Sequence, residues 1–272
     1  MIGIGLSLTV LRGRRPASRL HALLSTGATA LLVGGSLDPA RRNLWRDVAR
    51  TVPVTAAGQP VRSWRIRTLG ADVFATASAD ARRPTLVQFD GQWALDFDGV
   101  DDALQTPTIT PGADKVQTFA GVRKIGTDVA MLADWGLSPT VTNGSFYVAA
   151  PLNTTIQYAS IARGSTPVDT SHRSDITLGP APDNAVIAAA SDIAASLTTL
   201  RRNGVAGTLA TGALGTGDFS AQVLNIGARN DASLRYRGLV FGLAVRFGPN
   251  LTDAVRNRAE SIMSELVPGV SL

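Results

Sequence analysis

The sequence of 272 residues contains no cysteine, and other chemically versatile residues are scarce. Without cysteine the chain can form no disulfide, no thiolate metal site and no cysteine nucleophile. Its two histidines, His21 and His172, lie far apart, and neither belongs to a metal-binding motif such as H-E-x-x-H. The sequence therefore predicts a fold held by packing and backbone hydrogen bonds, and it argues against a histidine metal centre.

Long apolar runs are absent as well. The stretch 20–33 is apolar and follows four arginines, which superficially resembles a signal peptide. Polar residues at 25–29 interrupt it, however, and the arginines follow an apolar opening. No run reaches the roughly 18 apolar residues that a membrane span requires. We therefore expect a soluble chain with no membrane partner.

Charge is unevenly distributed along the chain. Residues 1–70 contain eleven arginines against Asp38 and Asp47, a local balance of +9, whereas the whole chain carries +5. This asymmetry predicts a basic N-terminal arm that docks on an acidic surface, although a solvated basic surface would show the same pattern. The predicted anchoring residues are Arg12, Arg14, Arg15 and Arg19. Nucleic acid is not expected as the partner, because no interleaved aromatic residues or reader motif accompany the arginines.

From about residue 85 onward, short runs alternate between apolar and polar residues and end at Gly, Pro, Asn or Asp, which is typical of a sandwich or jelly roll. Asp90-Gly91 and Asn203-Gly204 each join two such runs, and both dipeptides favour a two-residue type I′ hairpin. The four hairpin strands cover 85–89, 92–97, 197–200 and 205–208. Further strands are predicted at 116–123, 129–135, 145–150, 155–162, 184–190, 223–228 and 238–247.

The two ends of the chain show other patterns. Residues 2–10 alternate like a strand, and residues 18–33 predict a short helix. Near the C-terminus, Thr252 can cap a helix whose apolar residues repeat at helical spacing as far as Leu266. The sequence thus predicts three parts: a basic arm at 1–37, an irregular lead-in at 38–84 packed on the sandwich, and the sandwich with its C-terminal helix at 85–272.

Several motifs carry a resemblance to a known superfamily. Residues 83–87, 90–93 and 95–102 resemble the "RPTL…DG.W.L.FDGVDD.L" stretch of laminin G-like, concanavalin A-like domains. Residues 200–205 resemble the "LYVNG" hairpin of the same superfamily, and residues 224–227 and 236–243 resemble its closing strands. The resemblance implies a concanavalin A-like antiparallel jelly-roll sandwich. With the C-terminal helix and the basic N-terminal anchoring segment predicted above, the expected fold class is mainly β.

An upstream segment resembles a particular subset of proteins that contain such domains. Residues 44–47 and 51–61 are similar to phage and prophage structural proteins that read "LFQD..GTTPVTA.GQPV" before the sandwich. This implies a virion protein made in the bacterial cytoplasm, a tail fibre, spike or head decoration that assembles as a homo-oligomer and contacts other virion proteins through its N-terminal segment. Its sandwich would bind host-surface glycan. A purely architectural decoration protein without a ligand is the alternative.

The resemblance also bears on catalysis. Glucanases of this fold use two glutamates on one strand, one as acid and one as nucleophile or base. Here Glu260 and Glu265, the only glutamates, lie on the predicted C-terminal helix. A glycan-cleaving enzyme would have to use an aspartate pair such as Asp96 and Asp98, which share a strand face. We therefore expect no catalytic residues and no enzyme activity.

Two ligand-binding possibilities remain open. Asp98, Asp101 and Asp102 crowd one turn and could bind calcium, although aspartates that cap a turn would give the same sequence. No cofactor is otherwise required. Glycan contact would need exposed aromatic faces, for which the candidates are Trp135, Tyr147, Tyr158 and Tyr236. Each of these residues also fits a core position.

Overall fold

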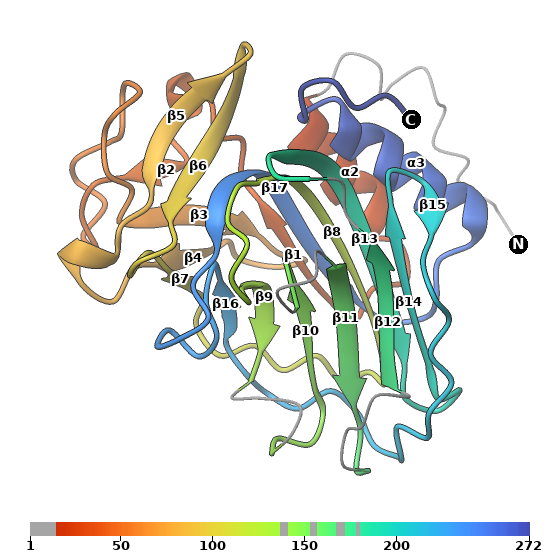
Figure 1. Cartoon of the computed structure of the whole chain (residues 1–272). Helices are drawn as coiled ribbons and strands as arrows, with labels where there is room; N and C mark the ends of the chain where they lie inside the picture. Colours follow the sequence, from red (N-terminus) through yellow and green to blue (C-terminus); the bar gives the residue numbers. More distant parts are fainter. Residues whose placement is uncertain (1–14, 137–140, 153–156, 167–171, 178–179) are drawn as a thin grey trace, which may run out of the picture.

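The alternating runs form strands because every second side chain is buried between two sheets. The computed structural model, which describes residues 15–136, 141–152, 157–166, 172–177 and 180–272, is a sandwich whose strands all pair antiparallel (Figure 1). The back sheet and its appended strands comprise β15 (Val205–Ala206), β14 (Leu197–Arg202), β13 (Asp183–Asp192), β8 (Lys115–Lys124), β17 (Arg237–Phe247), β1 (Ala30–Gly34), β6 (Gln92–Asp98) and β5 (Thr85–Phe89). The front sheet comprises β12 (Arg173–Thr177), β11 (Gln157–Arg163), β10 (Ser145–Ala149), β9 (Met131–Trp135), β16 (Leu224–Ile226) and β7 (Leu104–Gln105). The predicted fold class, a mainly-β antiparallel sandwich with a short C-terminal helix, is confirmed.

Both lateral sides of the sandwich are bridged. On one side, β3 (Ser63–Arg67) pairs with β1 and β2 (Leu44–Trp45) along one edge. Its other edge pairs with β4 (Val73–Thr76), which reaches the front sheet at β7. On the other side, the Thr208 N–H donates to the Asp175 carbonyl at 2.8 Å, which ties the chain after β15 to β12. The sandwich is therefore almost closed into a barrel.

Strand β17 pairs with three strands. One edge pairs with β8 along nearly its whole length. The other edge pairs with β6 through residues 237–240 and with β1 through residues 244–247. Residues 241–243 have no strand partner on this second edge among the described residues.

Aromatic side chains fill the space between the two sheets. Trp135 stacks on Phe146 with 6.0 Å between ring centroids, and Phe247 lies 4.8 Å from Trp135. Trp64 and Phe97 are also fully buried in this core. Burial of about 25 cal/mol per Å² of apolar surface makes this layer the main source of stability in a chain without disulfides.

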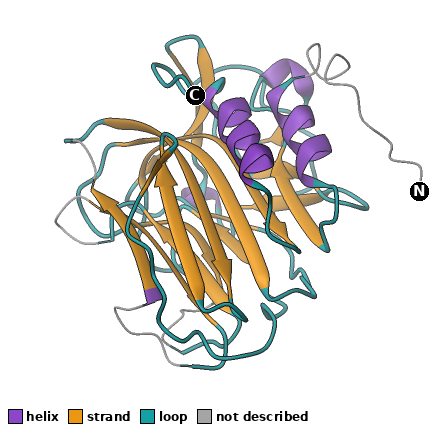
Figure 2. Ribbon diagram, turned by 90° about the vertical axis from the view of Figure 1, so that its right-hand side faces the viewer, coloured by secondary structure: helices purple, strands orange, loops and turns teal. Residues whose placement is uncertain are grey.

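Two helices cover the outer face of the back sheet, side by side in Figure 2. Helix α2 (Pro16–Leu24) and helix α3 (Asp253–Ser264) bury their apolar faces against β8, β13 and β17. Gly121 and Gly242 are paired across β8 and β17, and a Cβ at either would lie within 3 Å of an α3 or post-helix side chain. Thr252 caps α3 by accepting the Val255 N–H, as predicted. Neither helix of the described chain is long and apolar enough to span a lipid bilayer.

The local turn predictions are confirmed. Asp90 and Gly91 have φ angles of 46° and 77°, and Asn203 and Gly204 have 49° and 76°, as a type I′ turn requires. The other predicted strands exist, with bounds that differ by a few residues at most. The C-terminal helix runs from Asp253 to Ser264 and packs on the sandwich.

The predictions for the N-terminal half need correction. The helix expected at 18–33 ends at Leu24, and residues 30–34 form β1 instead, because this all-apolar strand is buried on both faces. The lead-in at 38–84 is not irregular throughout, since it contains β2, β3 and β4. Residues 2–10, Arg12 and Arg14 lie outside the described residues.

The segment 15–37 is not a free arm. Arg19 is buried and forms a two-pronged ion pair with Glu265, at 2.6 and 2.8 Å. Arg15 donates to the Asp38 carboxylate at 2.7 Å. Because the Arg19 side chain is buried and engaged within the chain, the prediction that Arg19 anchors the protein to a partner is wrong. Arg15 is exposed, and its part in docking stays a prediction.

A buried arginine fixes the connection between α2 and β1. The Arg246 guanidinium donates to the carbonyls of Leu24, Thr26 and Pro249 and to the Gln117 side chain, at 2.6 to 3.0 Å. Burial lowers its pKa, with no carboxylate partner to offset the effect. Four neutral acceptors thus hold the N-terminal segment against β8 and β17.

The contact between Gly34 and Trp64 gives a test of this packing. A Cβ at Gly34 would lie 2.1 Å from the Trp64 ring, which is fully buried and fixed by an indole N–H bond to the Gly35 carbonyl at 2.9 Å. We expect Gly34→Ala to lower the free energy of unfolding by at least about 2 kcal/mol, measured by urea denaturation. Gly70→Ala is the control, because a Cβ there meets nothing within 4 Å. Equal effects of the two substitutions would contradict the packing described.

Candidate functional site

Charged side chains surround the loop between β16 and β17, and we call them the polar rim. They are Arg82, Asp98, Asp101, Asp102, Asp134, Asp231 and Arg235. In this loop, residues 229–235, which we call the rim loop, three non-glycine residues have left-handed backbones: Asn230, Asp231 and Leu234, with φ of 48°, 53° and 50°. Asn and Asp adopt this conformation readily, but a leucine there costs on the order of 1–3 kcal/mol and persists only where its surroundings enforce it. The rim loop is therefore a strained segment whose conformation other groups must maintain.

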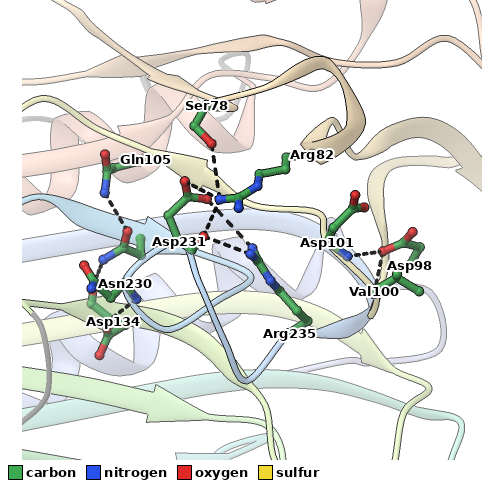
Figure 3. A network of polar contacts seen from close by, with 11 residues as sticks. Ser78, Arg82, Asp98, Val100, Asp101, Gln105, Asp134, Asn230, Asp231 and Arg235 are labelled. Carbon is green, nitrogen blue, oxygen red and sulfur yellow. Dashed lines mark hydrogen bonds and ion pairs between the residues drawn. The ribbon is translucent and has the colours of Figure 1, made fainter.

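Two arginines supply that constraint (Figure 3). Arg82, from the segment before β5, donates to the Asp231 carboxylate at 2.8 Å and also to the Asp231 carbonyl. Arg235 donates to the same carbonyl at 2.8 Å. Burial lowers the pKa of Arg235, and the charge of Arg82 lowers it further. The charges of Asp231, Asp101 and Asp102 oppose both effects. Arg82 and Arg235 thus hold the rim loop in place, and Arg235 also interacts electrostatically with Asp101 and Asp102 in the acidic turn that follows β6.

That acidic turn brings together the predicted metal ligands. Oxygens of Asp98, Asp101 and Asp102 lie within 4.8 Å of one another. Asp98 accepts the N–H groups of Val100 and Asp101, at 2.7 and 3.3 Å, and Asp102 accepts the Asp98 N–H at 2.9 Å. The remaining carboxylate oxygens are ligands of the kind that calcium takes. The turn-capping interpretation therefore fits the contacts, and calcium binding at the turn stays a prediction.

The crowding of these carboxylates changes the pKa of Asp102. Its pKa is raised to about 6, mainly by burial and also by the charges of the neighbouring aspartates, while the hydrogen bond from the Asp98 N–H opposes the shift. A bound cation would relieve this repulsion, because it favours the ionised carboxylate.

A second acid lies beneath the rim loop. Asp134 on β9 is fully buried, and its Oδ2 accepts the Asn230 N–H at 3.2 Å. Its Oδ1 has no hydrogen-bond partner among the described residues. The adjacent positions across the front sheet are Asn225 on β16 and Tyr147 on β10, and Gln105 donates to Asn225 at 2.9 Å. The outer face of the front sheet thus has a polar row directly under the strained loop.

The predicted glycan-contacting aromatics are core residues. Trp135, Tyr158 and Tyr236 are fully buried, and their polar groups bond to Ser220, Asp183 and Arg123 inside the protein. Because a ring covered on both faces cannot stack on a sugar, the prediction is wrong for these three.

Tyr147 differs from the other three aromatics. It is 7% exposed, and the Arg229 guanidinium lies 5.3 Å from its ring centroid. Arg229 of the rim loop therefore covers the ring face of Tyr147.

The groups considered for catalysis are engaged elsewhere. Glu265 pairs with Arg19, and the buried Glu260 pairs with Arg201 at 2.7 Å. His21 and His172 each contact a backbone carbonyl, those of Thr68 and Ala213. Asp96 is half-buried on β6, and burial, then the Asp98 charge, raises its pKa.

Sequence reasoning missed Arg82, Asp231, Arg235 and Asp134. Arg82 and Asp231 are 149 positions apart, and neither belongs to a motif, so no local pattern reveals their contact. Only the Asn230-Asp231 pair carries a turn signal. It indicates a loop at this position without showing what the loop contacts.

No protein-family model matches the chain, and no curated protein matches it in sequence. Its fold is nevertheless similar to solved structures. An arabinofuranosidase complexed with arabinofuranosyl-α-1,2-xylobiose matches over 93% of this chain and 66% of its own, with a TM-score of 0.56 and 13% identity. A sialidase from Trypanosoma rangeli matches over 89% of this chain and 33% of its own, with a TM-score of 0.52 and 11% identity. The chain thus spans a third of the sialidase and less than two thirds of the arabinofuranosidase, and at these identities the likeness shows the fold alone.

The buried Asp134 makes a prediction about pH. Burial raises its pKa from 3.8 to about 7, against hydrogen bonds and the Arg229 charge that lower it. Between these two values the folded chain holds a proton that the unfolded chain releases, so the free energy of unfolding falls as pH rises. This difference corresponds to at most about 4 kcal/mol. Asp134→Asn should remove this dependence, so that the variant gains stability relative to wild type between about pH 4 and pH 8 in urea denaturation. Parallel pH profiles would contradict it.

Proposed function

We propose that this chain is a non-enzymatic virion component, a fibre, spike or decoration protein whose sandwich binds host-surface glycan at the polar rim. The observation that carries the binding role is the strained rim loop, held by Arg82 and Arg235 above the buried Asp134. Strained backbone, convergent polar groups and an acid with raised pKa gather at binding sites more often than elsewhere. Charged and amide side chains of this kind are suited to the hydroxyl groups of a sugar.

The non-enzymatic part of the proposal is supported by where the carboxylates lie. Hydrolysis of a glycosidic bond needs two carboxyl groups flanking the bond. Both glutamates are engaged with arginines on the helix side, away from the rim. Asp96 and Asp98 are the remaining candidate pair, and Asp98 accepts two backbone N–H groups of its own turn.

The virion part is supported by the resemblance of residues 44–61 to phage structural proteins. Assembly with itself and with other virion proteins belongs to the same proposal. Arg12, Arg14 and Arg15 remain the predicted docking contacts. Replacing Arg12 and Arg14 with Gln should reduce incorporation into particles purified from a producing host, measured by immunoblot, and unchanged incorporation would contradict docking through these two residues.

A glycan-array screen of the full-length chain, paired with a reducing-sugar release assay on the same glycans, tests the proposal. We expect binding without release, because Asp98 and Asp231 are engaged by backbone N–H groups and by Arg82, respectively, and Asp134 is fully buried beneath the loop. Release of reducing sugar would overturn the non-enzymatic role and implicate Asp96 and Asp98. If no glycan is bound on the array and no reducing sugar is released, the glycan-binding proposal is wrong and a purely architectural protein is favoured.

Calcium gives a second readout at the rim. If the acidic turn binds it, millimolar CaCl₂ should raise the melting temperature of the wild type and strengthen glycan binding. Asp101→Asn should abolish both effects, since Asp101 contributes a carboxylate to the cluster. Asp90→Asn is the matched control, because it removes the same charge at a distant hairpin whose turn also accepts Asn. A calcium effect that persists in Asp101→Asn would contradict a site at this turn.

A further inference from the structure

Two adjoining cavities lie where β6 and β1 separate along β17. The first, of about 350 Å³, is lined by the unpaired residues 241–243 and by Gln92 and Trp93 of β6. The second, of about 410 Å³, lies toward β3. Both are lined by Arg15, Ala17, Gly35 and Ser36, so they adjoin around the start of α2 and the end of β1. Each volume lies within the range of small-ligand sites.

Arginines dominate the second cavity. Arg15, Arg41, Arg65 and Arg67 all line it, and Asp72 is the one acidic residue that does so. Arg65 and Arg67 stand on the same face of β3, because Trp64 and Ile66 between them point into the core. The basic composition of the first 70 residues is thus concentrated, in part, at one concave surface.

The neighbouring carboxylates leave this cluster with excess positive charge. Asp38 is 2.7 Å from Arg15 and 3.6 Å from Arg41, while Asp72 is 3.8 Å from Arg65. Arg67 donates to the Ser18 hydroxyl at 3.2 Å. Four guanidinium groups therefore face two carboxylates, which leaves the cavity with excess positive charge that favours an anion. The Arg65 guanidinium also lies 5.5 Å from the centroid of the Trp45 ring.

The start of α2 adds to the same field. Among the residues that the structure describes, no side chain caps this helix, and its first turn contains no acidic residue. The positive end of its dipole lies at the wall that the two cavities share, which reinforces the attraction for an anion.

The first cavity offers a different kind of contact. Trp93 is half-buried, whereas the other three tryptophans are buried in the core. Its indole N–H and the Gln92 amide have no hydrogen-bond partner among the described residues. Because neighbouring side chains of a strand point to opposite faces, the indole and the amide meet the cavity from different sides of β6. The indole suits the apolar face of a sugar ring and the amide its hydroxyl groups.

We propose that the paired cavities bind an acidic saccharide, with a sugar ring in the first cavity and its carboxylate or sulfate among the four arginines of the second. The saccharide part of this inference rests on the proposed glycan-binding function, but the site is distinct from the polar rim. Guanidinium groups bind carboxylate and sulfate oxygens through paired, charge-assisted hydrogen bonds. A nucleic acid fits less well, because it needs an extended basic track and stacking aromatic residues rather than a small cavity.

Titration calorimetry with three probes tests the proposal: digalacturonate, sulfated galactobiose and neutral galactobiose. We expect the acidic probes to bind at least about tenfold more tightly than the neutral one at low salt, with the advantage shrinking as salt rises. The two acidic probes distinguish carboxylate from sulfate as the preferred group.

Substitutions of lining residues test whether the probes bind in these two cavities. The double substitution Arg41→Gln with Arg67→Gln should weaken acidic-probe binding roughly tenfold or more and leave neutral-probe binding unchanged. The double substitution Arg46→Gln with Arg258→Gln, at two arginines that line neither cavity, removes the same charge and should change affinity less than twofold. Trp93→Phe should remove the tryptophan fluorescence change that accompanies acidic-probe binding. Circular dichroism and melting temperature confirm that each variant is folded.

The outcomes separate this inference from the proposed function. Glycan binding on the array without any effect of the double substitution on the acidic probes would overturn the acidic site and leave the rim proposal standing. If inorganic sulfate binds in an Arg41- and Arg67-dependent manner while no saccharide binds, the saccharide assignment and the proposed function are both wrong. Full loss of acidic-probe binding in the double variant, with the rim variant Asp101→Asn unaffected, would support the site as described.

Discussion

Strand β17 must satisfy its backbone hydrogen bonds along both edges, and the rest of the structure depends on how it does so. Strand β8 covers one edge, but the other edge is shared between β6 and β1. These two strands come from segments about 60 positions apart, and each turns away before they meet. The first cavity lies at the resulting interruption of the sheet, and the end of β1 pairs with β3 instead. The same pairing makes the N-terminal segment part of the back sheet.

The arginine-rich composition has several structural outcomes. Some arginines pair with acids far away in sequence, as Arg19 does with Glu265. Arg246 is buried among neutral acceptors, where it fixes a loop. Arg82 and Arg235 hold a strained loop at the rim. Arg65 and Arg67 line a cavity together with Arg15 and Arg41, and their positive charge exceeds the negative charge of the neighbouring carboxylates. A single net-charge figure cannot separate these roles, because each depends on what lies within a few ångströms.

The features that were predictable from the sequence are those that short segments determine. Asp90-Gly91 forms its hairpin because two consecutive residues accept positive φ, and Thr252 caps its helix through its own side chain. The interpretation of residues 30–34 as helix was wrong because an all-apolar run carries no periodicity, and pairing with β17 and β3 decides its structure. Trp135 and Tyr236 could have been surface or core residues, since alternation does not say which face of a strand is covered. The contact of Arg82 with Asp231 depends on the completed fold and leaves no local signal.

The central claim is that the interruption beside β17 is a binding site whose charge comes from the N-terminal region. A crystal structure of the full-length chain soaked with digalacturonate tests this claim most directly. The account predicts electron density for a sugar ring beside Trp93 and residues 241–243, with a carboxylate within hydrogen-bond distance of Arg65 or Arg67. Density for the saccharide only elsewhere, with both cavities filled by ordered water, would contradict it.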